Sequence, residues 1–369
     1  MIRVGITELH GIAKEIALFP PDNVKYVSIH PKKHFIDRIV TSTAKGVFNY
    51  FEDGSVDFIE APLFPVVTSN KWIYTPADFP TVMNFGFMGF SIPRSLRCKI
   101  LNHLFNKAQF IKLLFKSYAG MRTFEQYGKY FEDSVLNKTD VLYPPIRKVD
   151  DDLIRFNKDY INILFVGDFF RKGGAHVVDA FEQLQNRFNN IKLQICVKRL
   201  KSDNAQLVKE YTEKINSNAN ITWSFVEREK MMAEIMPETD IFVCPTYKDS
   251  YGYAIEEAMA YGIPVIATNQ CAIPEIVEHN TNGFLIDIDH FDFVKNIKDY
   301  KIDFIPQNFK EYMNNMVIKY MSELISNYEL RLSFGMKSLH IARTKFSFER
   351  RNSYIASIYE QAAKQTLHT

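Results

Sequence analysis

DIFVCPTYKDSYGYAIEEAMAYGIPVIAT, residues 240–268, contains two acids, Asp249 and Glu257, with seven residues between them. The apolar runs at its two ends predict strands, and the sequence between them predicts a loop followed by a helix. Asp249 then lies in the loop at the carboxyl end of a strand, where open parallel sheets bind ligands, and Glu257 lies on the helix. A carboxylate there can accept hydrogen bonds from sugar or ribose hydroxyls. Neighbouring Glu256 is expected to be a solvated helix residue.

The surrounding sequence alternates short apolar runs with helical stretches from residue 159 to residue 286. Each run is rich in Ile, Val and Phe, is about as long as a buried parallel strand, and does not alternate with polar residues. The stretches between them, such as residues 175–188 and 231–238, carry apolar residues at spacings of three and four. This order predicts a doubly wound α/β domain. The six apolar runs are residues 161–167, 192–197, 221–226, 240–245, 264–268 and 283–286.

The first predicted strand leads into a turn with two glycines, DFFRKGG, at residues 168–174. Two glycines at a helix start allow close approach of the backbone, and the unpaired N–H groups there favour an anion. Arg171 and Lys172 add fixed positive charge. The segment matches neither GxGxxG nor a P-loop. From the residues alone, a phosphate site and an ordinary turn between strand and helix both remain open.

Together these segments resemble the retaining glycosyltransferases of family 4, which have the GT-B fold. The resemblance is carried by FVGDFFRKGG, by ITWSFVEREKMM, by the segment from DIFVCP through NTNGFLI, and by FGMKSLHIARTKFSFERRNSYIASIYEQA. It implies an α/β chain of two Rossmann-like doubly wound domains that face a central cleft, with a C-terminal helix that crosses back to the first domain. The expected boundaries are residues 1–156 for the acceptor-side domain, 157–345 for the nucleotide-sugar-binding domain and 346–369 for the helix.

The resemblance also implies roles for individual residues. Lys172, assisted by Arg171, would neutralise the donor phosphates, and Asp249 would hold hydroxyls of the transferred sugar. Glu257 would bind the nucleotide ribose. The other expected donor contacts are Gly11, Gly173, Tyr251, Gly252, Tyr253, Thr268 and Cys271 on the sugar and phosphates, and Phe225, Val226, Glu227 and Arg228 around the base.

Three positions depart from the family pattern. Asp249 stands where the family usually has the longer Glu, and Asp168 stands where an arginine is common, a loss that Arg171 could offset. Cys271 and Ala272 stand where a pair of glycines is expected. Each departure bears on the donor or on activity, and none removes the motif as a whole.

The composition excludes several other classes of protein. Lys and Arg number 45 against 43 Asp and Glu, so no overall charge favours nucleic acid. The four cysteines show no metal-ligand spacing, and no cluster predicts a metal site. No secretory signal opens the chain, and no apolar run approaches the length of about 18 residues needed to cross a membrane. A cytoplasmic protein that requires no cofactor beyond its nucleotide-sugar donor is expected.

The first half of the chain carries less recognisable sequence. IRVGI, VKYVSI and residues 64–69 predict strands of a second Rossmann-like domain. Gly11 is the remaining candidate for close approach to the donor phosphate. His10, Trp72 and Asp78 are candidates for the acceptor side, against the alternatives of an ordinary surface histidine and a hydrophobic loop with one exposed acid.

Residues 84–131 combine positive charge with an apolar pattern. They contain eight Lys and Arg against one acid, Glu125, and apolar residues from Leu96 to Phe115 recur at helical spacing. Such a segment can lie peripherally on an anionic membrane surface. The alternatives are a core-packed helix with a solvated basic face and a basic groove for an acidic glycan.

The sequence therefore predicts a metal-independent, retaining glycosyltransferase that transfers a hexose from GDP-mannose or a UDP-hexose to a glycan, glycolipid or glycoprotein acceptor. GDP-mannose is preferred only on the base rate of donor types, and no residue of the sequence selects it. The alternatives are a non-catalytic, glycosyltransferase-like nucleotide-binding subunit and another GT-B enzyme, such as a sugar phosphorylase or a UDP-sugar epimerase. A NAD-dependent dehydrogenase is disfavoured because GxGxxG and its downstream acid are missing. A homodimer is compatible with the sequence.

Overall fold

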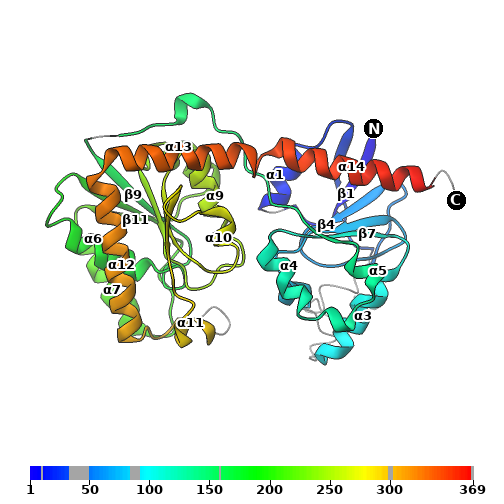
Figure 1. Cartoon of the computed structure of the whole chain (residues 1–369), viewed down its shortest axis with the longest axis horizontal. Helices are drawn as coiled ribbons and strands as arrows, with labels where there is room; N and C mark the ends of the chain where they lie inside the picture. Colours follow the sequence, from blue (N-terminus) through cyan, green and yellow to red (C-terminus); the bar gives the residue numbers. More distant parts are fainter. Residues whose placement is uncertain (10, 33–49, 84–91, 158, 298–301, 367–369) are drawn as a thin grey trace. The chain divides into compact units, whose positions relative to one another are not determined.

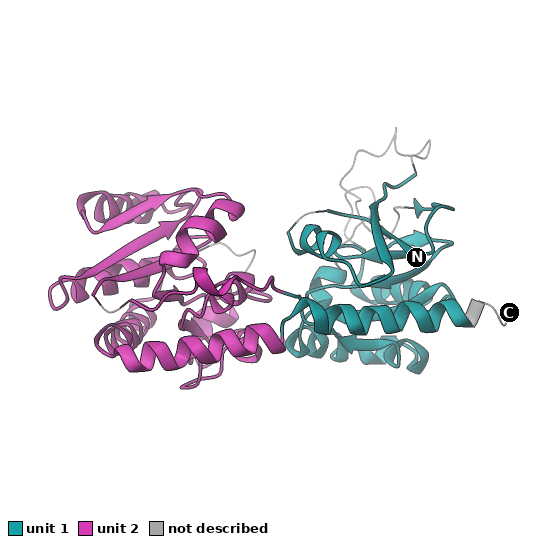
Figure 2. Cartoon of the chain, turned by 90° about the horizontal axis from the view of Figure 1, so that it is seen from above, with its two compact units in different colours: residues 1–145, 346–369 teal, residues 146–345 magenta. Residues whose placement is uncertain are grey.

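The computed structural model describes the chain except for residues 10, 33–49, 84–91, 158, 298–301 and 367–369 (Figure 1). The described chain divides into two compact units: unit 1 comprises Met1–Pro145 and Phe346–Thr369, and unit 2 comprises Ile146–Lys345 (Figure 2). Each unit has its own parallel sheet and its own hydrophobic core. The predicted pair of doubly wound domains is therefore confirmed.

The sheet of unit 2 has six parallel strands in the order β11-β10-β9-β12-β13-β14. The strand order reverses between β9 and β12, and doubly wound sheets bind ligands beside the carboxyl ends of the strands at such a point. The loops that follow these two strands carry Lys172 and Asp249. The strands are β9 (Ile161–Val166), β10 (Ile191–Cys196), β11 (Ile221–Ser224), β12 (Ile241–Cys244), β13 (Val265–Thr268) and β14 (Gly283–Ile286).

Helices cover both faces of this sheet. Alternate residues of β9, Ile161, Ile163 and Phe165, point to one face and pack with apolar residues of α6, α7 and α12. Helices α9 and α13 pack against each other away from that layer (Figure 1). The elements are α6 (Gly174–Leu184), α7 (Ala205–Ser217), α8 (Arg228–Lys230), α9 (Tyr253–Ala260), α10 (Ile273–Ile276), α11 (Asp292–Lys295), α12 (Gln307–Ser326), α13 (Tyr328–Thr344), the 3₁₀ turns η3 (Asp151–Leu153) and η5 (Met236–Glu238), and the π turn η4 (Met231–Ile235).

The main sheet of unit 1 also has six parallel strands, in the order β2-β1-β4-β6-β7-β8. Its residues alternate between two layers, so that Trp72 and Tyr74 of β6 face a core with α2, α3 and α4, whereas Ile73 faces the opposite core. The strands are β1 (Ile2–Ile6), β2 (Val24–Ser28), β4 (Phe58–Ala61), β6 (Lys71–Tyr74), β7 (Phe110–Phe115) and β8 (Thr139–Val141), with β3 (Tyr50–Phe51) and β5 (Val67–Thr68) in a separate two-stranded sheet.

The C-terminal helix α14 (Phe348–Thr366) packs on unit 1, as the family resemblance implied. Its apolar stripe, which includes Ile355 and Tyr359, joins Val4 and Phe58 in one core. The other helices of unit 1 are α1 (Ile12–Leu18), α2 (Phe79–Val82), α3 (Arg94–Asn106), α4 (Tyr118–Glu125), α5 (Asp133–Leu136) and the 3₁₀ turn η2 (Gly128–Tyr130).

Two details of unit assignment differ from the sequence prediction. Residues 146–156, assigned to the first domain, group with unit 2, because Arg343 on α13 donates to the carbonyl of Val149 at 3.3 Å and pairs with Asp151. Residues 64–69 form only the short strand β5, and β4, β6 and β7 supply the sheet instead.

Candidate functional site

Lys172 and Asp249 form an ion pair at the carboxyl end of the unit 2 sheet. The loop after β9 supplies Lys172 and the loop after β12 supplies Asp249, and Lys172 Nζ lies 2.9 Å from Asp249 Oδ2. The two side chains are 15% and 16% exposed. Each of the two side chains is thus largely shielded from water but is not fully enclosed.

Both members of this pair are held in their charged forms. Burial opposes the charge on Lys172, but the nearby Cys244 and Asp249 raise its pKa above the ordinary value. Burial likewise opposes the charge on Asp249, and Lys172 more than offsets it, so that the pKa of Asp249 lies below its ordinary value. An ammonium and a carboxylate are therefore present side by side at neutral pH.

Two glycines make room for this arrangement. Gly167 has a φ of 113°, and a Cβ there would lie 2.8 Å from Cδ of Lys172. Gly173 caps α6 with a φ of 78°, and a Cβ there would lie 2.3 Å from the carbonyl oxygen of Pro245. A side chain at Gly173 would push the two loops apart, whereas one at Gly167 would displace the Lys172 side chain.

Arg171 and Asp168 shape the first loop. The carboxylate of Asp168 accepts a hydrogen bond from the Arg171 backbone N–H at 3.1 Å, and its carbonyl accepts one from the Lys172 N–H. The Arg171 guanidinium reaches the second loop and donates to the carbonyl of Lys248 at 2.9 Å. Asp168, which stands where the family commonly has arginine, thus stabilises the turn that presents Lys172.

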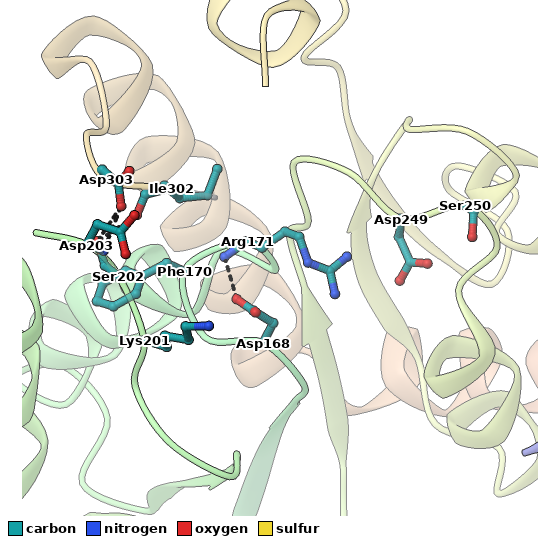
Figure 3. A pocket seen from close by; sticks show the side chains of 10 residues that line it. All are labelled: Asp168, Phe170, Arg171, Lys201, Ser202, Asp203, Asp249, Ser250, Ile302 and Asp303. Carbon is teal, nitrogen blue, oxygen red and sulfur yellow. Dashed lines mark hydrogen bonds between the residues drawn. The ribbon is translucent and has the colours of Figure 1, made fainter. Parts of the chain in front are cut away.

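A pocket of about 500 Å³ opens beside these loops. Figure 3 shows Asp168 and Arg171 in its middle, Asp249 and Ser250 at one end, and a polar group from the β10–α7 and α11–α12 loops at the other. The volume lies in the range of small-molecule sites. Its lining combines Arg171 and Lys201 with four carboxylates, those of Asp168, Asp203, Asp249 and Asp303.

Glu257 on α9 is paired with Arg228, which begins α8. Arg228 Nε donates to Glu257 Oε1 at 2.6 Å, and the Glu257 side chain is 9% exposed. The structure therefore brings together two residues that the resemblance assigned to ribose and base. The neighbouring residues Phe225 and Glu227 are exposed, and Lys198 Nζ lies 5.9 Å from the centre of the Phe225 ring. Val226 between them is half-buried.

The prediction that Glu256 is solvated is wrong. Its side chain is completely buried, and one carboxylate oxygen accepts a hydrogen bond from the Tyr251 hydroxyl. Its Oε2 has no hydrogen-bond partner, and burial raises the pKa of Glu256 well above its ordinary value. The helical pattern failed here because both α13 and the sheet cover α9, so that almost every side of this helix is enclosed.

The other predicted donor contacts lie at the start of α9 and in the loop after β13. Gly252 caps α9 with a φ of 106°, between the buried Tyr251 and the half-buried Tyr253. Cys271 is exposed and has a φ of 50°. The prediction that Thr268 contacts the donor is corrected. Its side chain is fully buried, and its hydroxyl donates to the Thr246 carbonyl at 2.5 Å, so Thr268 holds two strand ends together rather than facing the site.

Comparison with known proteins agrees with this geometry. A family model described as glycosyl transferases group 1 matches residues 147–316, which contain both loops and the Arg228–Glu257 pair. Residues 147–316 belong to this family. An uncharacterised 41.2 kDa protein of the cps region of Klebsiella pneumoniae is 28% identical over 42% of this chain and 40% of its own length. Spore coat protein SA of Bacillus subtilis is 23% identical over 54% of this chain and 48% of its own length.

Solved structures with the same fold cover nearly the whole chain. Anabaena HepE in complex with UDP and glucose aligns with a TM-score of 0.62 at 14% identity, over 98% of this chain and all of that one. Sucrose-phosphate synthase from Thermosynechococcus elongatus aligns with a TM-score of 0.64 at 13% identity, over 99% of this chain and all of that one. These likenesses confirm the GT-B fold. The chain spans about half or less of the length of the curated relatives it matches.

The acceptor-side candidates of unit 1 lie outside the group 1 region, and the structure corrects the prediction for Trp72. Trp72 is 1% exposed and packs against Phe110 with ring centres 4.7 Å apart, so it belongs to the core. Asp78 is half-buried and accepts a hydrogen bond from the Thr81 N–H at 2.7 Å, as the cap of α2. Gly11 is exposed at the start of α1 with a φ of 53°, and residue 10, the predicted His10, lies outside the described residues.

The apolar pattern of residues 84–131 is explained by core packing. Cys98, Leu101, Leu104 and Phe105 of α3 are buried in unit 1, and the helix ends at Asn106. The later apolar residues of the pattern lie on strand β7, so the single long helix implied by the spacing is wrong. Residues 84–91 of this segment are outside the described residues. Among the helices that the structure describes, none is both long and apolar enough to cross a membrane.

The sequence analysis did not single out several residues that line the pocket of unit 2, nor Glu8 of unit 1. Lys201, Ser202 and Asp303 line the pocket, and they follow β10 or precede α12, positions where loops at the carboxyl edge of the sheet converge. The carboxyl-end rule that selected Asp249 could have selected Lys201 as well. In unit 1, Glu8 follows β1, and burial raises its pKa to about 7. Only the folded structure reveals that shift.

Proposed function

We propose that this chain is a retaining glycosyltransferase of family 4 that transfers a hexose from a UDP-hexose or GDP-mannose to a glycan, glycolipid or glycoprotein acceptor. The observation that carries the proposal is the Lys172–Asp249 ion pair at the switch point of the unit 2 sheet, beside a pocket of about 500 Å³. A cation there can bind phosphate, and a carboxylate can bind sugar hydroxyls.

The chemistry requires stabilisation of the leaving group. As the bond between the anomeric carbon and the β-phosphate oxygen breaks, negative charge builds on the nucleoside diphosphate. Lys172, Arg171 and the backbone N–H groups at the starts of α6 and α9 would stabilise that charge. The acceptor hydroxyl would form the new bond on the same face of the sugar, and its proton would pass to the departing phosphate. Asp249 would hold the sugar during this step, without a covalent intermediate.

The test is calorimetric titration with UDP-glucose, UDP-galactose, UDP-N-acetylglucosamine, ADP-glucose and GDP-mannose. UDP-glucose is tested first because the fold neighbour HepE is described with UDP and glucose. Binding of one donor by the wild type, lost in Lys172→Ala and kept in Lys209→Ala, is expected. Lys209 is the matched control because it is 68% exposed on α7 and lines no part of the pocket. Binding without transfer or hydrolysis would instead favour a non-catalytic subunit.

We further propose a peripheral contact between α3 and an anionic membrane, where a lipid-linked acceptor would be found. Arg94 and Lys99 are exposed on this helix, Lys107 follows it, and Leu96 beside them is 48% exposed. Vesicles that contain phosphatidylserine should retain the protein at low salt and release it at high salt. The variant Lys99→Glu/Lys107→Glu should lose this retention, and Lys209→Glu should keep it. Absence of retention in the wild type would contradict the contact.

A further inference from the structure

A buried polar network lies beneath the candidate site in unit 2. His176 on α6 is completely buried, and its two ring nitrogens contact Asn314 Oδ1 on α12 and the Tyr247 hydroxyl, each at 2.6 Å. Asn314 Nδ2 donates to Asp179 Oδ2 at 3.2 Å. Asp179 also accepts a hydrogen bond from the Tyr211 hydroxyl at 3.0 Å and pairs with two lysines. Five side chains from four parts of unit 2, namely α6, α7, α12 and the loop after β12, are thus connected in one chain of hydrogen bonds.

The donor and the acceptor of each hydrogen bond can be worked out from the Asp179 end of the network. The Asp179 carboxylate only accepts, so the amide nitrogen of Asn314 faces it and the amide oxygen faces His176. Nδ1 of His176 must then donate. Burial lowers the pKa of His176 to about 4, so the ring is neutral and Nε2 carries no proton. Nε2 therefore accepts from the Tyr247 hydroxyl, and His176 is the Nδ1–H tautomer.

Tyr247 connects this network to the site. It lies two residues before Asp249, and its backbone N–H donates to the Arg171 carbonyl at 3.0 Å. Arg171 returns a hydrogen bond to the Lys248 carbonyl at 2.9 Å. The loop with Asp249 is thus joined to the loop with Lys172 through its backbone, and to the helix layer through the Tyr247 side chain.

We propose that the Tyr247–His176 hydrogen bond is a positioning contact that fixes Asp249 against Lys172 and so determines how tightly the site holds a nucleotide sugar. Neither residue lines the pocket, and each acts through the loop that does. The ligand named in this inference rests on the proposed function, whereas the positioning of Asp249 by the hydrogen bond does not. A misplacement of about 1 Å at such a site can cost roughly 100-fold in rate, so a single distant hydrogen bond is sufficient for a measurable effect.

Tyr211 provides a matched control. Like Tyr247, it is completely buried and donates its hydroxyl to the same network, and both rings pack against phenylalanines. Tyr211 is on α7, however, and its loss leaves Asp179 with Lys214 and Lys310. The substitutions Tyr247→Phe and Tyr211→Phe therefore remove the same group from the same network, and comparable falls in melting temperature are expected. Only the first one releases the loop of Asp249.

The first test needs no ligand. In hydrogen exchange of the full chain, amides of residues 246–251, which include the bonded N–H groups of Tyr247 and Tyr251, should exchange about tenfold faster in Tyr247→Phe. In Tyr211→Phe they should stay within about twofold of wild type. Nitrogen NMR of the wild type should show His176 as the neutral Nδ1–H tautomer at pH 6. Equal exchange in the two variants, or the other tautomer, would overturn the proposal.

The second test addresses function with UDP-glucose and GDP-mannose as probes. For whichever probe binds the wild type, the dissociation constant should rise about tenfold in Tyr247→Phe and less than twofold in Tyr211→Phe. Equal losses of affinity in the two variants would show that the hydrogen bond contributes only to core stability, and would overturn its positioning role. If neither probe binds the wild type while the exchange difference is present, the donor assignment fails and the positioning contact stands.

Discussion

Two buried ion pairs join distant parts of the chain, and they differ in how completely their charges are satisfied. In unit 1, Arg351 of α14 meets Glu60 of β4 at 2.6 Å, with exposures of 3% and 0%, and the second oxygen of Glu60 accepts hydrogen bonds from Tyr26 and Tyr359. In unit 2, Lys172 meets Asp249 at 2.9 Å, and both keep about one-sixth of their surface exposed.

This difference separates a structural contact from a site. The Glu60 carboxylate is enclosed by three donors, Tyr26 of β2 and Arg351 and Tyr359 of α14, so nothing can reach it without unfolding α14 from the sheet. The ammonium of Lys172 faces one protein carboxylate at the edge of the sheet, where a phosphate could compete for it. The first pair should therefore control stability with no direct part in binding, and the second should control binding with little effect on stability.

The largest effect is expected for Glu60→Ala. Removal of the carboxylate leaves the Arg351 guanidinium buried and unpaired, which should lower the free energy of unfolding of unit 1 by about 3–5 kcal/mol. Urea denaturation followed by circular dichroism measures this change. The double variant Glu60→Met/Arg351→Met, which removes both charges, should regain most of the loss. A single variant as stable as wild type would show that the pair does not hold α14.

Lys172→Ala should have the opposite profile. Loss of one preorganised cation at the leaving group should reduce transfer about 100- to 1000-fold. The free energy of unfolding should change far less than in Glu60→Ala, because solvent can reach the remaining Asp249 carboxylate. Donor titration and urea denaturation on the same preparation measure both quantities. Undiminished donor affinity and turnover would remove Lys172 from the phosphate site.

Glu256 extends the comparison to a buried acid without a cation. Burial raises its pKa in the folded state above the ordinary value of 4.5, so the folded protein binds this proton more tightly than the unfolded chain. Its contribution to stability is therefore greatest below pH 4.5 and falls as the pH rises toward the folded pKa. Glu256→Gln should remove this dependence, so its stability relative to wild type should increase by about 1.4 kcal/mol for each pH unit over the range in which Glu256 stays protonated in the fold. Parallel pH–stability curves would show that Glu256 is ionised in the fold.

The smallest effect is expected for Glu257→Gln, measured as nucleotide affinity. Its carboxylate is paired with Arg228 and is 9% exposed, so substitution removes a charge-assisted acceptor from the proposed ribose site. The dissociation constant for the nucleotide should rise about tenfold. Glu256→Gln is the control on the same helix, because the Glu256 side chain is completely buried. Equal losses in the two variants would contradict the assignment of Glu257 to the ribose.

The sequence analysis succeeded best in unit 2, where strand, loop and helix follow one another in short segments. The strands β9 to β14 begin and end within two residues of the predicted runs, because buried parallel strands need continuous apolar sequence and leave a clear pattern. Lys172 and Asp249 each follow such a strand, and the family resemblance supplied their roles. Unit 1 was harder, since the apolar residues of α3 and β7 merge into one apparent helical pattern.

The sequence by itself determined the two doubly wound units, the group 1 region and the chain positions of Lys172, Asp249 and Glu257. Those features depend on local periodicity and on the order of segments, which the chain records directly. Only the tertiary structure decided that Glu256 is enclosed, that Trp72 is core and that Tyr247 reaches His176 and, through it, Asn314. Burial and long-range hydrogen bonds depend on which faces of distant elements meet, and no single segment carries that information.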